Sequence, residues 1–297
     1  MTESVLSLET PLLAGRAVVV TGSGRGLGRE YALAASLHGA SVVLNDVDVD
    51  AANAVAAEIA DAGGRVEAVN GDIASWTVAE ALIDRCIDAF GKIDCLVNNA
   101  GVFHICDPWA DTEADIRRAV DTNVLGTMFP GTHAVARMQA QRFGVILNVT
   151  SGSQTGHPTE AAYSATKAAV AALTYSWALA LRTHGVRVNA ISPTGDTPML
   201  EITRAHRATT VVWPPAWAAA LAIYLMSDLS APMTGQVVRL WDRDLAVMTQ
   251  PKLALPVLTH ESPWTVRDIA DAFATDLKDS RQPIGLGDVE PRLSVGH

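Results

Sequence analysis

The feature that most constrains the fold of this chain is a regular alternation between short apolar runs and longer alanine-rich segments. The apolar runs are continuous, and continuous runs are typical of strands that are buried on both faces of a sheet. Short links connect each run to the segment that follows it. Such strand–helix alternation predicts parallel strands that are joined by right-handed crossovers. We therefore predict an α/β fold, in which a doubly wound parallel sheet of seven strands lies between two helical layers in a single domain.

The predicted elements follow one another along most of the chain. The strands are expected at residues 17–22, 41–46, 66–72, 93–101, 144–151, 186–193 and 236–241. The helices are expected at residues 29–39, 49–64, 77–91, 112–142 and 160–184, with a loop and a buried helix over 211–226. The catalytic domain would span residues 12–245. Residues 246–297 would form a C-terminal extension, with a helix over 261–277, that packs on the core or on a partner subunit.

Charge and cysteine content exclude several classes of function. The net charge is −10, from 22 basic and 32 acidic residues, and the chain has no basic block of five or more. We therefore expect no nucleic-acid partner and no membrane surface. The three cysteines form no CxxC pair and indicate reduced thiols and no metal site. The first residues lack the pattern of a secretion signal. We expect a cytoplasmic protein.

A glycine-rich stretch, TGSGRGLG at residues 21–28, lies between the first predicted strand and the first predicted helix. Gly22, Gly26 and Gly28 follow the spacing G-x-x-x-G-x-G. Glycine permits a tight turn and lets a pyrophosphate approach the backbone, and the helix N-terminus that follows offers free N–H groups. The strand before the loop and the helix after it favour a dinucleotide-binding loop over a plain flexible turn.

Two side chains bear on which dinucleotide would bind. Asp46 ends the second predicted strand, where a carboxylate accepts hydrogen bonds from the adenosine ribose and repels a 2′-phosphate. Arg25 acts in the opposite sense, because a cation inside the glycine loop could pair with a 2′-phosphate. We give the carboxylate more weight and predict NAD as the cofactor, with NADP as the alternative. Asp46 could instead serve only as a cap for the next helix.

Five motifs occur in order along the chain: TGSGRGLG at 21–28, NNAG at 98–101, Asn123 in DTNVLGT, Ser151 in NVTSGS, and Tyr163 with Lys167 in YSATK. Together they resemble the short-chain dehydrogenase/reductase family, from about Arg16 to Trp241. The resemblance implies a Rossmann-like fold, a nicotinamide cofactor, a small-molecule alcohol or ketone substrate, and a homodimer or homotetramer. Ser151, Tyr163 and Lys167 would form the reaction centre, and Asn123 would hold a water molecule in a proton relay.

The resemblance also implies positions along the cofactor. Asp72 would contact the adenine ring, Asn98 and Gly101 would lie along the dinucleotide, and Thr197 would meet its nicotinamide half. The expected cofactor-binding residues are Gly22, Arg25, Gly26, Leu27, Gly28, Asp46, Asp72, Ile73, Asn99, Ala100, Gly101, Tyr163, Lys167, Pro193 and Thr197.

Two positions depart from the family pattern. Ser151 and Tyr163 are 12 residues apart, one fewer than family members usually show, so Ser153 is a substitute candidate for the serine. Pro193 is followed by Thr194, where the family commonly has glycine. Within the family, residues 21–47 look most like the dehydrogenase unit of multifunctional (3R)-hydroxyacyl-CoA enzymes.

The chemistry of the Tyr163–Lys167 pair explains why these residue types would be needed. Residues four apart share one helical face, although such a pair is also common on a solvated helix. A tyrosine has an ordinary pKa of about 10. A nearby ammonium favours the phenolate, so we expect Lys167 to lower the pKa of Tyr163. Ser151 would hydrogen-bond the substrate oxygen while charge changes on it.

The sequence therefore predicts an NAD-dependent oxidoreductase that interconverts a secondary alcohol and a ketone, on 3-hydroxyacyl-CoA-like or other partly apolar substrates. A non-catalytic protein that senses the NAD/NADH ratio is the alternative, and its usual mark would be a damaged reaction centre. A structural partner in an assembly is a third reading, for which the C-terminal extension is the only hint.

Overall fold

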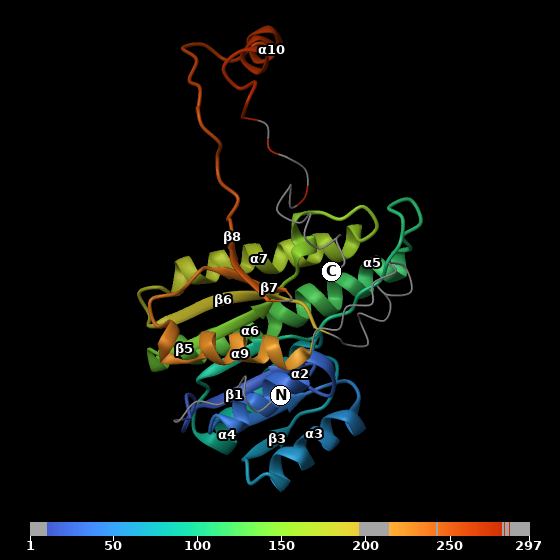
Figure 1. Cartoon of the computed structure of the whole chain (residues 1–297), viewed down its shortest axis with the longest axis vertical. Coiled ribbons are helices and arrows are strands. Elements are labelled where there is room, and N and C mark those ends of the chain that lie inside the picture. Colours follow the sequence, from blue (N-terminus) through green and yellow to red (C-terminus); the bar gives the residue numbers. More distant parts are fainter. Residues whose placement is uncertain (1–10, 196–213, 242, 281, 283–284, 286–297) are drawn as a thin grey trace. The chain divides into compact units, whose positions relative to one another are not determined.

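Eight strands form one sheet in the computed structural model of the chain, in the order β3-β2-β1-β4-β5-β6-β7-β8 (Figure 1). The structure describes residues 11–195, 214–241, 243–280, 282 and 285. The strands are β1 (Ala17–Thr21), β2 (Ser41–Asn45), β3 (Val66–Ala68), β4 (Cys95–Asn98), β5 (Gly144–Val149), β6 (Val186–Pro193), β7 (Val237–Trp241) and β8 (Asp244–Met248). The first seven strands pair in parallel, and β8 pairs antiparallel with β7.

The helices connect successive strands and cover both faces of the sheet. The α-helices are α2 (Gly26–Leu37), α3 (Val49–Asp61), α4 (Trp76–Phe90), α5 (Glu113–Ala119), α6 (Gly126–Gln141), α7 (Ala161–Leu181), α9 (Pro215–Met226) and α10 (Val266–Ala274). The shorter helical turns are η1 (Val120–Leu125), η2 (Gly152–Thr155) and η3 (Asp228–Ser230). The predicted doubly wound α/β fold is confirmed.

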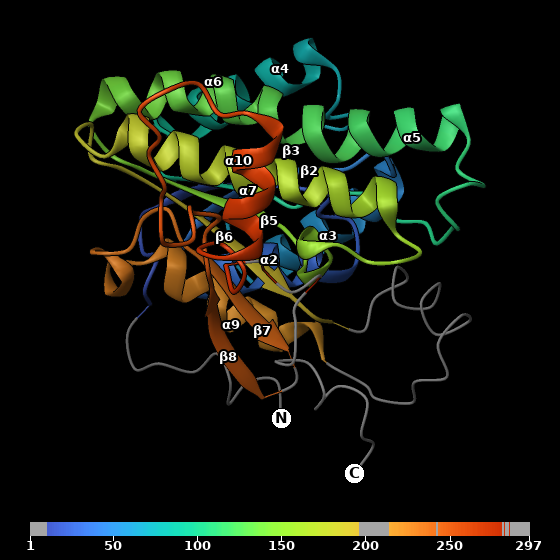
Figure 2. The same cartoon turned by 90° about the horizontal axis from the view of Figure 1, so that it is seen from above.

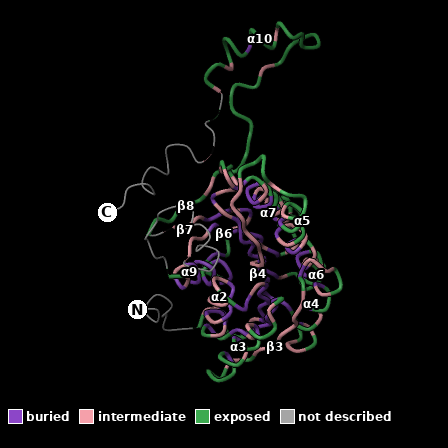
Figure 3. The backbone as a smooth tube through the Cα atoms, turned by 90° about the vertical axis from the view of Figure 1, so that its right-hand side faces the viewer, coloured by how far each residue is buried: buried purple, intermediate pink, exposed green. Residues whose placement is uncertain are grey.

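Two hydrophobic cores flank the sheet because alternate strand residues point to opposite faces. In β1, Val18 and Val20 pack in the core that contains α2, α3 and α9, whereas Val19 packs in the core that contains α4, α6 and α7. Figure 2 shows α4 and α6 on one side of the sheet and α9 on the other. Figure 3 shows the buried residues concentrated along the strands. This double coverage is the physical reason for the continuous apolar runs in the sequence.

The strand order places a candidate ligand site at one edge of the sheet. From β1 the chain proceeds outward through β2 and β3, and it then returns to β4, which lies on the other side of β1. In such a sheet, ligands bind outside the carboxyl ends of the strands at this point of reversal. The loops after β1, β4 and β5 carry the glycine stretch, the NNAG motif and Ser151. The fold therefore brings three separate motifs to one end of the sheet.

Two elements differ from the sequence-based expectation. The described residues form eight strands rather than seven, because β8 adds an antiparallel edge strand. Four of its five residues are exposed, so it lacks the burial that marks the central strands, although residues 245–248 are apolar. The helix predicted over 112–142 is interrupted by η1, a π-helical turn that contains Asn123. Single π-helical turns within helices are frequent at functional sites.

The chain divides into two compact units, Met1–Met248 and Thr249–His297. In the second unit, α10 begins with a capping box in which the side chains and backbone amides of Thr265 and Asp268 bond reciprocally. Ile269 and Phe273 are exposed on this helix. Where the extension packs stays a prediction. Among the residues that the structure describes, no helix is both long and apolar enough to cross a bilayer.

Candidate active site

The glycine loop packs directly on backbone, which is why it requires glycine. Gly22 has a φ of +62°, in the left-handed region, and a Cβ added there would lie 2.8 Å from the Cα of Ala100. A Cβ added at Gly28 would collide with the carbonyl oxygen of Gly22. Neither neighbour is a side chain that could rotate away. The two glycines therefore let the start of α2 approach the ends of β1 and β4 closely.

No side chain caps the N-terminus of α2. Arg25 occupies the N-cap position, and its side chain makes no hydrogen bond to the first turn. Its guanidinium instead pairs with the carboxylate of Asp48 at 3.1 Å. The first N–H groups of a helix have no intrahelical partner, and they carry the positive end of the helix dipole. The loop thus presents a set of donors suited to a phosphate group.

Asp46 is buried directly after β2 and faces the glycine loop. Its Oδ2 atom accepts a hydrogen bond from the backbone N–H of Gly24 at 2.8 Å, and its Oδ1 atom accepts from the backbone N–H of Asp48 at 3.0 Å. Asp46 therefore helps to hold the loop in place. Each carboxylate oxygen has further acceptor capacity, so this role is compatible with a ribose contact.

The NNAG motif fastens the end of β4 to the end of β1. The amide of Asn99 donates to the carbonyl oxygens of Thr21 and Gly22, at 3.0 Å each. The Thr21 hydroxyl accepts from the backbone N–H groups of Asn99 and Ala100. Asn98 lies within the sheet, where its buried amide donates to the side chain of Asn148 at 2.9 Å. Asn99, rather than Asn98, is the asparagine that contacts the glycine loop.

The remaining expected cofactor positions lie around the same edge. Asp72 is exposed after β3, and its carboxylate accepts from the backbone N–H of Ala74. Ile73 is buried beside it, and Pro193 is the last residue of β6. A Cβ added at Gly195 would lie 2.9 Å from Cδ2 of Leu27, so Leu27 reaches toward the end of β6. Thr197 lies outside the described residues.

Tyr163, Lys167 and Ser151 come together at the carboxyl end of β5. Tyr163 and Lys167 lie one turn apart in the first part of α7, and both are buried. The Lys167 Nζ atom is 5.6 Å from the centre of the Tyr163 ring and donates to the carbonyl oxygen of Val149 at 2.8 Å. Ser151 follows Val149 by two residues and lowers the pKa of Tyr163. Ser151 therefore acts on the tyrosine although the spacing between them is one residue shorter than is usual in the family.

Burial dominates the electrostatics of this group. The pKa of Tyr163 is raised to about 12, chiefly by burial; the hydrogen bond from Ser151 lowers it and the charge of Glu160 raises it. Burial lowers the pKa of Lys167 to about 8. The expected net fall in the pKa of Tyr163 is therefore not seen in this structure, because burial raises the pKa above its ordinary value. Desolvation outweighs the ammonium, which donates to a backbone carbonyl instead of the phenol.

Asn123, in the π-helical turn η1, forms hydrogen bonds to two parts of the reaction centre. Its Nδ2 group donates to the Val102 carbonyl oxygen and to the Thr166 hydroxyl, and its Oδ1 atom accepts from the Val102 N–H. Both N–H bonds of the amide are thus used within the protein. Thr166 in turn donates to the carbonyl oxygen of Tyr163. The side chain of Asn123 therefore connects the NNAG segment to α7, and a water molecule would have to be held by its backbone.

A family model described as short chain dehydrogenase matches residues 16–208, which is more than half of the chain. The chain belongs to the short-chain dehydrogenase family. A 7alpha-hydroxysteroid dehydrogenase of Escherichia coli is 33% identical over 237 residues, covering 76% of this chain and 92% of that protein. A sorbitol dehydrogenase of Cereibacter sphaeroides is 40% identical over 188 residues, covering 61% of this chain and 70% of that protein.

Solved structures agree with this assignment. The crystal structure of a short chain dehydrogenase from Mycobacterium avium superposes with a TM-score of 0.82 at 30% identity, covering 92% of this chain and 98% of that chain. Members of the short-chain dehydrogenase family are oxidoreductases that use nicotinamide cofactors, and this chain has the fold and the ordered motifs of that family.

The structure adds residues to the centre that the sequence reasoning did not assign to it. The ring of Phe103 meets the Tyr163 ring edge-on, with 4.8 Å between centroids. Glu160 is buried one turn before Tyr163 and accepts a hydrogen bond from Ser153 at 2.6 Å. Its position three residues before the tyrosine, on the same helical side, is the signal that could have identified it.

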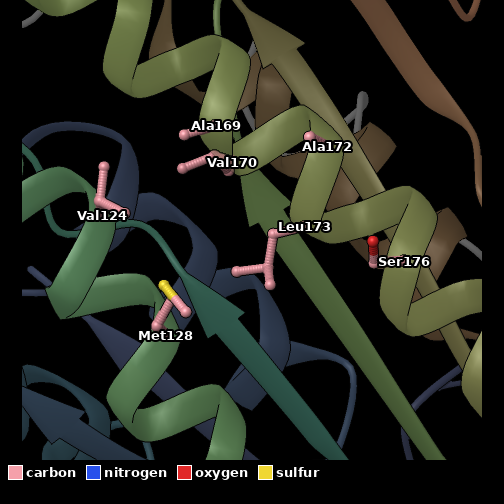
Figure 4. A pocket seen from close by; sticks show the side chains of 7 residues that line it. All are labelled: Val124, Met128, Ala169, Val170, Ala172, Leu173 and Ser176. Atoms are coloured by element: carbon pink, nitrogen blue, oxygen red, sulfur yellow. The ribbon is translucent and has the colours of Figure 1, made fainter.

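A surface hollow lies away from these side chains in this short-chain dehydrogenase. It has a volume of about 310 Å³ and lies between η1 and α6 on one side and α7 on the other. Figure 4 shows Val124, Met128 and Leu173 pointing into it, with Ser176 at one end. It contains none of the expected catalytic side chains. Within the described ranges, no group of three or more histidine, cysteine, aspartate or glutamate side chains is arranged to hold a metal ion.

Proposed function

We propose that this chain interconverts a secondary alcohol and a ketone, with NAD(H) as the preferred cofactor and Tyr163 as the acid–base group. The observation that carries the proposal is that Tyr163 and Lys167 are buried one helical turn apart and lie with Ser151 at the carboxyl end of β5. A hydroxyl pair of this kind, at the end of a sheet whose neighbouring loop suits phosphate, has the parts that alcohol–ketone chemistry needs.

Each side chain has a definite task in the proposed reaction. In ketone reduction, the phenol of Tyr163 gives its proton to the substrate oxygen, and in alcohol oxidation the phenolate takes that proton back. Ser151 hydrogen-bonds the same oxygen as negative charge develops on it. Lys167 is mostly protonated at pH 7 and stabilises the phenolate by its charge. Asn123 is a positioning residue, because it fixes the backbone of Tyr163 through Thr166.

The residues at the carboxyl edge of the sheet fit a nicotinamide dinucleotide. The open N-terminus of α2 would hold the pyrophosphate, and Asp46 would meet the adenosine ribose. Lys167 would hold the nicotinamide ribose, and Asn99, Ala100 and Gly101 would border the chain of the cofactor. The dinucleotide, when bound, supplies the group that accepts or donates hydride. Gly101 supports this assignment, since a Cβ there would lie 3.2 Å from Oδ1 of Asn123 and 3.5 Å from Nζ of Lys167.

A screen for NADH formation and consumption tests the proposal. Hydroxyacyl-CoA esters, hydroxysteroids and cyclic alcohols should be offered with NAD, and the matching ketones with NADH, while absorbance of the reduced cofactor is recorded. Turnover of any secondary alcohol or ketone supports an enzyme. Tight dinucleotide binding with no turnover across all three classes would favour the sensor alternative, although the intact Ser151, Tyr163 and Lys167 side chains argue for catalysis.

Cofactor choice gives a separate prediction. We expect NADH to bind more tightly than NADPH by roughly tenfold or more, because a 2′-phosphate near the buried Asp46 would be a like-charge contact. The Arg25–Asp48 ion pair further reduces the positive charge that Arg25 could offer to that phosphate. Fluorescence titration with each reduced cofactor measures both affinities.

Two variants sharpen this test. Asp46→Asn removes the charge and retains an acceptor oxygen. It should therefore reduce the difference between the affinities for NADH and for NADPH. Asp50→Asn makes the same change at an exposed carboxylate in the first turn of α3 and should leave the ratio unchanged. Tighter binding of NADPH by the unmodified protein would show that Arg25 outweighs Asp46.

The substrate is proposed only as a class. The two relatives described above are named for a steroid alcohol and for a sugar alcohol, which supports a CH–OH substrate without selecting one. The likeness of residues 21–47 to hydroxyacyl-CoA dehydrogenases adds that class to the screen. The cytoplasmic location and the homo-oligomeric state stay predictions.

A further inference from the structure

Glu160 is an unusual neighbour for the acid–base tyrosine, because it is an acidic side chain that is buried beside a phenol. Its side chain is 4% exposed, and it lies one helical turn before Tyr163. The family motifs account for Ser151, Tyr163 and Lys167, and they leave Glu160 without a role. Burying a carboxylate costs free energy unless it is hydrogen-bonded or paired. The contacts of Glu160 therefore indicate what it does.

A chain of hydrogen bonds connects Glu160 to the reaction centre. The hydroxyl of Ser153 donates to Oε2 of Glu160 at 2.6 Å. Ser151 donates to the oxygen of Ser153 at 3.4 Å and accepts from the Ser153 backbone N–H at 3.2 Å. Ser151 also acts on Tyr163, whose pKa it lowers. Because a carboxylate can only accept, the hydroxyl of Ser153 must be the donor to Glu160, and the oxygen of Ser153 can then accept from Ser151.

We propose that Glu160 is a positioning residue for the reaction centre: it orients the hydroxyl of Ser151 through Ser153, and its buried negative charge, one helical turn from Tyr163, opposes ionisation of that phenol. The inference rests on the proposed alcohol–ketone function and deepens it. A protonated phenol is the form that delivers a proton to a ketone. Glu160 thus adds to the effect of burial in opposing the change of Tyr163 from an acid to a base.

Several titratable groups surround Glu160. Its titratable neighbours in the described part of the chain are Tyr163 on its own helix, His157 in the preceding loop, and Cys106, whose backbone forms a bridge with that of Glu160. Nδ1 of His157 lies 3.5 Å from Oε1 of Glu160, and the Cys106 thiol donates to the carbonyl oxygen of Asp107. A protonated His157 would partly neutralise the carboxylate, whereas a neutral His157 would leave the charge of the carboxylate in place.

Glu160→Gln tests the charge while preserving the geometry, because the glutamine amide oxygen can still accept from Ser153. With an alcohol that the unmodified protein oxidises, we expect the midpoint of the oxidation pH profile to fall by about one pH unit. Removing the negative charge makes the phenolate easier to form, so oxidation below the old midpoint should become faster. Glu160→Asp keeps the charge and should restore most of the original profile. A role in folding alone predicts a loss of activity with no shift in the profile.

Ser153→Ala tests the hydrogen-bond chain separately. It leaves the charge of Glu160 in place but frees Ser151, so we expect kcat/KM to fall roughly five- to tenfold with the pH midpoint unchanged. Thr155→Ala is the matched control, because it removes an exposed hydroxyl from the same helical turn that bonds only to the Gly152 carbonyl oxygen among the contacts described. That variant should match the unmodified protein in rate and in midpoint.

A spectroscopic titration gives a readout that does not depend on turnover. Tyrosinate absorbance should appear at lower pH in Glu160→Gln than in the unmodified protein, once the signal that remains in Tyr163→Phe is subtracted. Superimposable pH profiles and titrations for the two proteins, or a Ser153→Ala rate equal to that of Thr155→Ala, would overturn this inference alone. An unmodified protein that turns over no alcohol or ketone would overturn the proposed function, and this inference with it.

Discussion

Tyr163→Phe is expected to lower kcat by about 10²- to 10⁴-fold, since a positioned acid–base group contributes a rate factor of that size. The substitution removes one oxygen atom and leaves the ring, with its edge-on contact to Phe103, in place. Reduced-cofactor affinity should therefore stay within a few-fold of the original. The measurements are steady-state kinetics with the best alcohol from the screen and fluorescence titration with NADH.

The matched control is Tyr175→Phe, which makes the same change on the same helix three turns away from the centre. Tyr175 packs in the small core cluster that contains Ala171 and Val237. Its variant should keep the original kcat. Turnover retained by Tyr163→Phe would remove the acid–base role of this phenol, whereas equal losses in both variants would point to damage to the helix.

Lys167→Met is expected to make the protein more stable and less active. Burial lowers the pKa of Lys167 from an ordinary 10.5 to about 8, so holding its charge at pH 7 costs about 3 kcal/mol. The hydrogen bond to the Val149 carbonyl offsets part of that cost. Methionine fills a similar volume without a charge. We expect the free energy of unfolding at pH 7 to rise by about 1 to 2 kcal/mol.

The gain in the free energy of unfolding of Lys167→Met should depend on pH. Between about pH 8 and pH 10.5, the unfolded chain holds the lysine proton and the folded chain has released it. Stability of the unmodified protein therefore rises across this window, and below it the full cost of the buried charge is present. The advantage of Lys167→Met should be largest at pH 7 and should disappear near pH 10.5. Urea unfolding at several pH values measures it.

Lys167→Met should oxidise alcohols less well, although it should be more stable. The ammonium lies 5.6 Å from the Tyr163 ring centre, and its loss disfavours the phenolate. The pH needed for alcohol oxidation should therefore increase, and NADH should bind less tightly if Lys167 holds the ribose. Lys252→Met, at an exposed lysine, is the control and should change neither stability nor rate. An unchanged oxidation profile in Lys167→Met would contradict its proposed role.

The fold could be predicted from sequence because its signals are local. A strand that is covered on both faces needs continuous apolar residues, and β1, β4 and β5 are buried along their whole length. The edge strand β8 was not predicted. Residues 245–248 are apolar, but four of the five strand residues are exposed, so β8 is not one of the strands covered on both faces. The π-helical turn at Asn123 was also missed, because its residues have an ordinary helical pattern.

The sequence by itself determined the motif set: the glycines of the first loop, Asp46, Ser151, Tyr163 and Lys167 were all named from residue type and order. Only the tertiary structure decided which of two serines reaches Tyr163, that Asn99 rather than Asn98 holds the glycine loop, and that Glu160 lies in the centre. It also reversed the expected direction of the Tyr163 pKa. The physical reason is that a motif specifies which groups are present, whereas burial and hydrogen-bond partners, which set proton affinity, arise when distant segments pack together.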